Sequence, residues 1–218
     1  MTAAELSALL VLATATSFTP GPNTTLSTAL AANKGLKRAL PFICAVPVGW
    51  GLMFALCAGG LGALVVAQPL LRWAVLIGGC LYLLWLAKRL WGSRSLSQAN
   101  TSQLDVTFWQ GVGLQFLNIK AWMLALSLVA GWVAGHPDAP ARFAQVLPLM
   151  VAFAFCSNFT YALVGSVLRH WLAGPIVNGA ATGKRLMVFN RVMALALVLT
   201  AGWMWISSTH QATNVGTI

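Results

Sequence analysis

Long uncharged runs separated by short basic or polar stretches dominate the chain. Four such runs cover 6–33, 39–71, 143–168 and 192–209. A helix needs about 20 apolar residues to cross a bilayer, so each run can hold a spanning helix. The hydrophobic pattern predicts helices at 6–28, 40–67, 70–90, 107–133, 143–168 and 188–208.

Composition supports the same fold class. Hydrophobic residues make up 59% of the 218 residues and charged residues 7%, whereas soluble domains carry roughly 25% charged residues. We therefore expect an all-α, polytopic membrane protein that forms a single transmembrane domain over 1–218. A polar stretch divides it into a first half (1–92), a linker (93–106) and a second half (107–218).

The basic residues indicate orientation. The net charge is +10, and most basic residues fall in the first, third and fifth predicted loops: Lys34, Lys37, Arg38, Lys88, Arg89, Arg94, Arg169, Lys184, Arg185 and Arg191. Arg72 and Arg142 lie on the opposite side. The positive-inside rule places the basic loops and the linker in the cytoplasm and both termini outside, in a bacterial inner membrane. This placement argues against nucleic acid as a partner.

Two halves of three helices each must enter the membrane in opposite orientations. That layout is typical of transporters built from inverted repeats, in which interrupted helices hold the substrate near the bilayer midplane. We expect the paired glycines at Gly59-Gly60 and Gly78-Gly79 to let helices pack closely. We expect the tryptophans, Trp203 and Trp205 included, to form interfacial belts rather than a stacking site.

The first predicted helix carries an interruption, Thr19-Pro20-Gly21-Pro22-Asn23. Each proline lacks a backbone N–H, and Gly21 permits otherwise strained angles. Exposed helix ends offer N–H and C=O groups that suit the carboxylate and ammonium of an amino acid. The alternative is a kinked helix without ligand contact.

The fourth predicted helix has polar residues at Gln115, Asn118 and Lys120. A charged residue at mid-bilayer is costly, so it usually faces a cavity or a partner. Lys120 either binds a substrate carboxylate or snorkels to the cytoplasmic interface, and the spacing leaves both possibilities open.

The sequence lacks the residues that several classes of function require. Glu5, Asp105 and Asp138 are the carboxylates of the whole chain, and all three fall in predicted ends or loops. No span therefore contains the acidic or histidine cluster that a metal-efflux site needs. The four cysteines fall in apolar stretches without C-x-x-C spacing, which favours packing over redox chemistry. We expect neither an enzyme nor a bound cofactor.

The motifs resemble those of the lysine-exporter (LysE) translocator family and its homoserine/threonine-exporter (RhtB) branch, over nearly the whole chain. The strings that carry the resemblance are Thr19-Pro20-Gly21-Pro22-Asn23, Lys34-Gly35-Leu36-Lys37-Arg38, Leu81-Tyr82-Leu83-Leu84-Trp85-Leu86-Ala87, Phe108-Trp109-Gln110-Gly111 and Gln115-Phe116-Leu117-Asn118-Ile119-Lys120-Ala121-Trp122. The family usually has proline where this chain has Ile119. Members that resemble cysteine and O-acetylserine exporters carry a β-branched residue there and share Leu56-Cys57-Ala58-Gly59.

These features predict a secondary exporter of small amino acids, of the cysteine/O-acetylserine or the homoserine/threonine kind. The predicted substrate-binding residues are Thr19, Pro20, Gly21, Pro22, Asn23, Gln115, Asn118 and Lys120. The alternatives are a metal-ion efflux protein, an intramembrane thiol or redox carrier, and a non-transporting scaffold. The sequence leaves open whether copies of the chain form a homo-oligomer.

Overall fold

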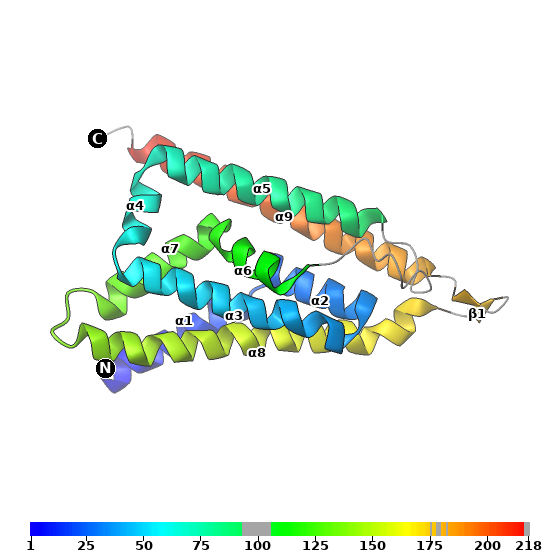
Figure 1. Cartoon of the computed structure of the whole chain (residues 1–218), viewed down its shortest axis with the longest axis horizontal. Coiled ribbons are helices and arrows are strands. Elements are labelled where there is room, and N and C mark those ends of the chain that lie inside the picture. The colour runs from blue at the N-terminus through cyan, green and yellow to red at the C-terminus, as the bar shows by residue number, and fades with distance from the viewer. Residues whose placement is uncertain (93–105, 175, 178–179, 182, 216–218) are drawn as a thin grey trace.

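The structure is a computed structural model that describes residues 1–92, 106–174, 176–177, 180–181 and 183–215 (Figure 1). The predicted linker lies outside these residues, apart from Val106. The helices are α1 (Ala3–Phe18), α2 (Pro22–Lys34), α3 (Leu36–Ala58), α4 (Leu61–Ala67), α5 (Pro69–Gly92), α6 (Phe108–Phe116), α7 (Ile119–Leu128), a π-helical turn (Val129–Val133), α8 (Ala139–Ala173) and α9 (Lys184–Val215). A minimal hairpin pairs β1 (Ile176–Val177) with β2 (Ala180–Ala181).

The predicted all-α class is confirmed. Within the described chain, α3, α5, α8 and α9 are each long and apolar enough to cross a membrane. Two bent pairs of shorter helices add two more spans if each pair is counted as one: α1 with α2, bent by 51°, and α6 with α7 and the π-helical turn, bent by 69°. The number of predicted spans, about six, corresponds to counting each bent pair as one span.

The first predicted helix is broken where the prolines lie. Helix α1 ends at Phe18, and Pro22 occupies the first turn of α2, where its missing N–H costs nothing. Gly21 is extended, with φ −156° and ψ −175°, a conformation that any residue adopts. The expectation that Gly21 supplies strained angles is therefore wrong, and the prolines account for the break.

The second predicted helix, 40–67, is not continuous. Helix α3 ends at Ala58, and α4 starts three residues later at Leu61. Gly60 has φ +90°, in the left-handed region that glycine alone adopts easily. No atom lies within 4 Å of a Cβ built on Gly60, so Gly59-Gly60 turns the chain rather than packing helices. Gly79 does pack closely, because a Cβ there would collide with the carbonyl oxygen of Leu117.

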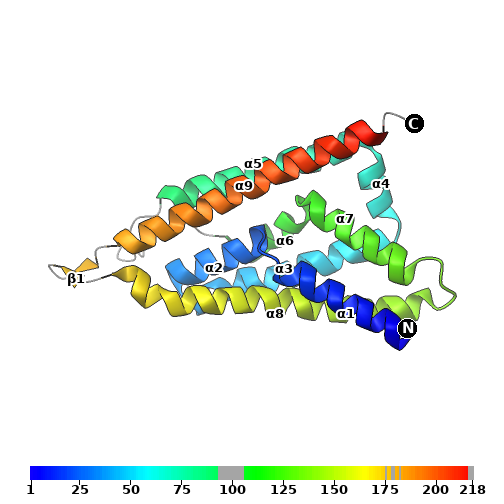
Figure 2. The ribbon, with the colours of Figure 1, turned by 180° about the vertical axis from the view of Figure 1, so that it is seen from behind.

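The helices form a bundle in which α2 is embedded and α1 is peripheral. Helices α5 and α9 run side by side, as do α3 and α8, while α2 packs on α8 and α6 packs on α3 (Figures 1 and 2). The α1–α2 and α6–α7 breaks both lie near the middle of the long axis (Figure 2). The tertiary arrangement thus brings together two interruptions that lie about a hundred residues apart in sequence.

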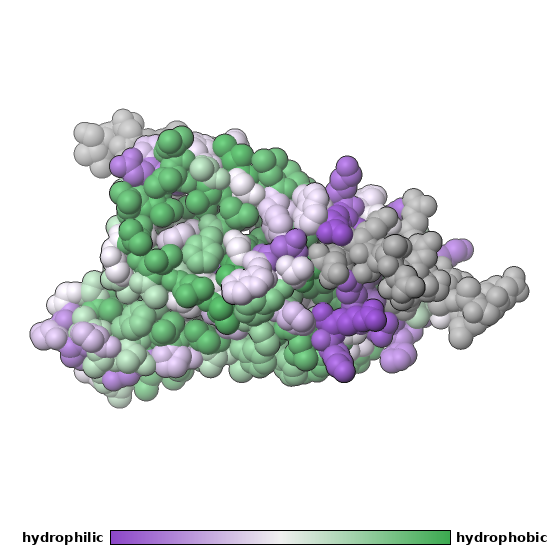
Figure 3. Space-filling model, viewed as in Figure 1, coloured by the Kyte–Doolittle hydropathy of each residue, from purple (hydrophilic) through white to green (hydrophobic). Residues whose placement is uncertain are grey.

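The basic residues gather toward one end of the molecule, next to an apolar band (Figure 3). The predicted placement of these residues in loops is wrong for the first loop. Lys34 ends α2, Gly35 turns the chain, and Lys37 and Arg38 lie in the first turn of α3. Arg94 lies outside the described residues. The start of α1 and the end of α9 share the opposite end of the molecule (Figures 1 and 2).

A polar cluster fastens the start of α1 at that opposite end. The Arg142 guanidinium of α8 contacts Glu5 at 3.0 Å and Asp138 at 2.9 Å. The indole N–H of Trp132 donates a hydrogen bond to the Glu5 carbonyl oxygen at 3.1 Å. The hydrogen bond from Arg142 also holds the pKa of the Asp138 carboxyl below its usual value. Helix α1 is therefore tied to the turn that precedes α8.

Candidate functional site

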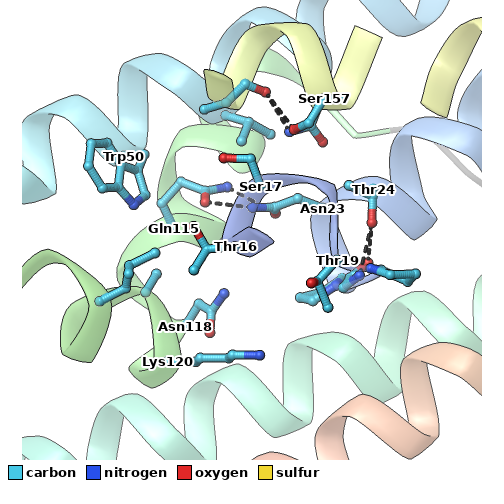
Figure 4. Close-up of a pocket in the computed structure, with 18 of the residues that line it drawn as sticks. Thr16, Ser17, Thr19, Asn23, Thr24, Trp50, Gln115, Asn118, Lys120 and Ser157 are labelled. Carbon is cyan, nitrogen blue, oxygen red and sulfur yellow. Dashed lines mark hydrogen bonds between the residues drawn. The ribbon is translucent and has the colours of Figure 1, made fainter. Parts of the chain in front are cut away.

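The site is built where the two breaks face each other. The C-terminal ends of α1 and α6 and the N-terminal ends of α2 and α7 meet there (Figure 4). Helix C-termini carry partial negative charge and N-termini partial positive charge. The meeting point therefore offers both signs of charge without any acidic side chain.

A reciprocal amide pair connects the two breaks. Asn23 Nδ2 donates to Gln115 Oε1 at 2.9 Å, and Gln115 Nε2 donates to Asn23 Oδ1 at 3.1 Å (Figure 4). Gln115 Nε2 also donates to the Gly111 carbonyl oxygen, and the Gln115 side chain is 1% exposed. Two side chains predicted separately as site residues thus join the first half of the chain to the second.

A cavity of about 400 Å³ surrounds this pair, within the usual range of 300–1,000 Å³ for small-molecule sites. All eight residues predicted from sequence line it: Thr19, Pro20, Gly21, Pro22, Asn23, Gln115, Asn118 and Lys120. They come from the first and fourth predicted spans, as expected. Their role in binding a substrate remains a prediction.

Asn118 lines this cavity and carries an unused acceptor. It is the N-cap residue of α7, but its side chain caps no backbone N–H. Its Oδ1 atom is buried and has no hydrogen-bond partner. An unpaired buried acceptor costs about 1–3 kcal/mol, so a ligand donor such as an ammonium group would relieve that cost.

Lys120 lies just beyond the second break, in the first turn of α7, and lines the cavity. Its Nζ atom lies 4.6 Å from the centroid of the Trp203 ring of α9. The sequence left open whether Lys120 faces the cavity or the interface, and the structure places it in the cavity. Trp203, which the sequence predicts in an interfacial belt, also contacts Lys120 through the face of its ring.

The second break forms without the family's proline. Leu117 and Asn118 leave the helical path, and Asn118 adopts φ −100° and ψ 94°. The indole N–H of Trp122 donates to the Phe116 carbonyl oxygen at 2.9 Å, which satisfies one acceptor released by the break. Gly79 leaves room for the Leu117 carbonyl. A local hydrogen bond across the break and the tertiary contact with Gly79 therefore stabilise the break that Ile119 does not impose.

Several residues that line the cavity were not predicted from the sequence. Asn158 and Ser157 of α8 line the cavity, and Asn158 Oδ1 accepts a hydrogen bond from Ser27 at 2.9 Å. Trp50 of α3 forms part of the apolar wall. A buried polar pair within the apolar run 143–168 was a usable signal, because such residues inside a membrane are commonly functional.

The lining restricts the chemistry. Among the described residues that line this cavity, none is acidic and none is a cysteine. Among the described residues no group of three or more His, Cys, Asp or Glu side chains could hold a metal ion. The described geometry therefore suits a small zwitterion better than a divalent cation.

Comparison with known proteins gives a consistent result. The family model described as LysE type translocator matches residues 14–208. A protein named cysteine/O-acetylserine efflux protein from Salmonella typhimurium is 29% identical over 209 residues, covering 92% of this chain and 97% of its own. Proteins of the same name from Klebsiella pneumoniae (29% over 172 residues, 78% of this chain and 86% of its own) and Escherichia coli K12 (27% over 205 residues, 92% and 97%) also match. No solved structure matches.

Proposed function

The chain belongs to the LysE type translocator family, and from this premise we propose that it is a secondary exporter of small amino acids, cysteine or O-acetylserine foremost, from cytoplasm to periplasm. The relatives named above are efflux proteins for these compounds. The observation that carries the proposal is the meeting of four helix ends, Lys120 and the unpaired Asn118 Oδ1 around one cavity. Such a protein is a multi-pass protein of the bacterial inner membrane.

The cavity matches both charges of an amino acid. The substrate carboxylate would bind the Lys120 ammonium and the N-terminal end of α7. The substrate ammonium would donate to Asn118 Oδ1 and approach the C-terminal ends of α1 and α6. Each group of the ligand meets a complementary group of the protein, and a compound that lacks either charge loses one of the two.

The transport cycle proposed is alternating access between two inverted halves of three spans. Each half begins with a broken span. In transporters with inverted repeats, interrupted helices occupy corresponding positions of the two halves. We assign the basic end to the cytoplasm by the positive-inside rule. On that side of the first break, Leu26, Ser27 and Leu30 are at most 2% exposed, and this burial supports our assignment of the arrangement to a state closed toward the cytoplasm.

Efflux from preloaded cells tests the function. Cells are loaded with labelled cysteine, O-acetylserine, threonine or lysine, and loss of label is followed with and without the expressed protein. Wild type should accelerate loss of a small neutral amino acid. Asn118→Ala and Lys120→Gln should each reduce that acceleration by about tenfold or more, because each removes one half of the zwitterion's binding groups.

The matched control is Ser127→Ala on the same helix. Ser127 is exposed and its hydroxyl bonds the Met123 carbonyl oxygen, away from the cavity. Wild-type efflux from a correctly inserted Asn118→Ala protein would contradict the site assignment. No acceleration with any of the four amino acids would contradict the exporter itself.

Replacing Cys44, Cys57, Cys80 and Cys156 together with alanine separates the exporter from a thiol carrier. All four thiols are free and none lines the cavity. An exporter keeps most of its efflux after the replacement, whereas a redox carrier loses its function. A scaffold protein, by contrast, would show no dependence of efflux on Asn118.

A further inference from the structure

Lys120 is held by an aromatic ring rather than by a carboxylate. Its Nζ atom lies 4.6 Å from the Trp203 ring centroid, and within the described chain no acidic side chain pairs with it. The face of an aromatic ring attracts a cation. Unlike a carboxylate, the ring does not neutralise the ammonium or engage its three N–H donors in strong hydrogen bonds. The charge of Lys120 therefore stays available to an anionic ligand group.

Trp203 also lines a second cavity, of about 310 Å³, beside the first. This cavity, here called the α9 lobe, is bounded by Pro20, Gly21, Pro22, Asn118, Lys120, Leu199, Thr200, Trp203 and Met204. The first five residues line the main cavity as well. Lys120 and Asn118 therefore lie at the boundary between the two spaces, and α9 forms a wall that the sequence did not suggest.

We propose that Trp203 is a positioning residue that holds the Lys120 ammonium at this boundary, ready for the substrate carboxylate, and that the α9 lobe receives the substrate side chain. The inference rests on the proposed exporter function and deepens it. A substrate that places its carboxylate on Lys120 and its ammonium on Asn118 uses residues common to both cavities. Its side chain can then occupy the α9 lobe.

The lobe selects side chains by charge. Apart from Asn118 and Lys120 at its boundary with the main cavity, the only polar side chain among its described lining residues is Thr200, whose hydroxyl already donates to the Ala196 carbonyl oxygen at 2.8 Å. None of the described residues that line the lobe is acidic. A cationic side chain would find no counter-ion there and would face the Lys120 ammonium, so like charges would meet at short range. The lobe therefore accepts neutral side chains and rejects those of lysine and arginine.

Trp205 offers a matched control on the same helix. It is 45% exposed, similar to Trp203 at 53%. Its ring lies 5.6 Å from that of Trp73 in α5, and it lines neither cavity. If tryptophans near this end of α9 served as membrane anchors alone, replacement of either residue would have a similar effect.

The test measures export kinetics in proteoliposomes with labelled O-acetylserine. Trp203→Leu should raise KM by about tenfold with little change in maximal rate, because it weakens binding of the carboxylate through Lys120. Trp203→Phe keeps a ring face and should restore most of the wild-type KM. Trp205→Leu should stay within about twofold of wild type.

A double-mutant cycle separates positioning from general packing. In a Lys120→Gln background, Trp203→Leu should produce no further rise in KM, since the charge that Trp203 positions is already absent. Competition by unlabelled lysine should stay weak in wild type and rise in the Lys120→Gln variant. If the Trp203→Leu protein does not insert into the membrane, Trp203→Phe is compared with Trp203→Met. That pair also contrasts an aromatic ring with a non-aromatic apolar side chain.

Three outcomes would overturn the inference alone while wild type still transports O-acetylserine. These are equal effects of Trp203→Leu and Trp205→Leu, a Trp203→Met protein with the KM of Trp203→Phe, and an undiminished Trp203 effect in the Lys120→Gln background. Wild-type protein that transports none of the tested amino acids would overturn the proposed function, and this inference with it.

Discussion

The two halves of the first broken span differ sharply in how they are held. Helix α1 buries only Leu9 and Ala13 among its sixteen residues. Helix α2 is shorter, at thirteen residues, yet eight are buried: Thr24, Leu26, Ser27, Thr28, Ala29, Leu30, Ala31 and Ala32. Three of those eight are polar. The break therefore separates a peripheral helix from one that is embedded in the bundle.

Polar bridges tie α2 to three neighbouring helices. Asn23 pairs with Gln115 of α6, Ser27 with Asn158 of α8, and Asn33 with Asn190 of α9. Helix α8 approaches so closely that a Cβ on Gly165 would collide with the Thr28 carbonyl oxygen. Helix α2 thus closes the cavity toward the basic end of the molecule.

Helix α1 is attached mainly at its two ends. Glu5 contacts Arg142 at the start of α1, and the Tyr161 hydroxyl donates to the Phe18 carbonyl oxygen at its last residue. Between these points most of its side chains are at least partly exposed. Opening of the cavity toward the basic end therefore requires breaking the packed polar interface of α2. Motion of α1 requires only the release of the contacts at its two ends.

The largest effect is expected at the α2–α8 contact. Gly165→Leu should prevent α2 from closing on α8, because the new side chain has no space beside Thr28. Efflux should fall by more than about tenfold while the protein still inserts. In a background without native cysteines, Ser27→Cys, otherwise buried, should then react with a maleimide.

Gly202→Leu on α9 is the control for that substitution, because no atom lies within 4 Å of a Cβ there. It should leave efflux and labelling near wild-type levels. An unlabelled Ser27→Cys in an inserted Gly165→Leu protein would show that α2 tolerates the substitution without leaving α8, and would contradict the role assigned to this contact.

A smaller effect is expected from the bridge between Ser27 and Asn158. Ser27→Ala, Asn158→Leu and the double variant form a cycle on two side chains that are at most 3% exposed. Interhelical hydrogen bonds of this kind couple by about 0.6 kcal/mol on average and up to about 1.7 kcal/mol. Unfolding in detergent measures the coupling free energy, and a value near zero would mean that this bridge does not help to hold α2 on α8.

The smallest effect is expected at the start of α1. Arg142→Gln removes the partner of both Glu5 and Asp138, and partly exposed ion pairs contribute little to stability. Efflux should stay within about twofold of wild type. A large loss of efflux would indicate that the start of α1 is held as firmly as α2.

The same substitution carries a pH signature. The pKa of Asp138 is lowered in the folded protein by its hydrogen bond to Arg142. Its stabilising contribution is therefore present above the unfolded-state pKa and is lost as the pH falls through the folded-state value. Melting temperatures measured between pH 7 and pH 3 should show this acid-side loss in wild type and a weaker one in Arg142→Gln.

The sequence by itself determined the helical class, the approximate spans and the position of the first break. These depend on local chemistry: apolar runs of sufficient length, and prolines that lack an N–H. The eight predicted site residues were also recognisable locally, because polar groups within apolar spans are costly. The structure brings all eight to one cavity, although substrate binding by them stays a prediction.

The tertiary structure decided what depends on distant neighbours. The Gly59-Gly60 pair could pack helices or turn the chain, and the left-handed angle of Gly60 shows the turn. The second break lacks the proline, and the Leu117 carbonyl there fits against Gly79 of α5, 38 positions away in sequence. Trp203 meets Lys120 across 83 positions of sequence. Contacts of this kind arise from how helices pack, which hydrophobic periodicity alone does not specify.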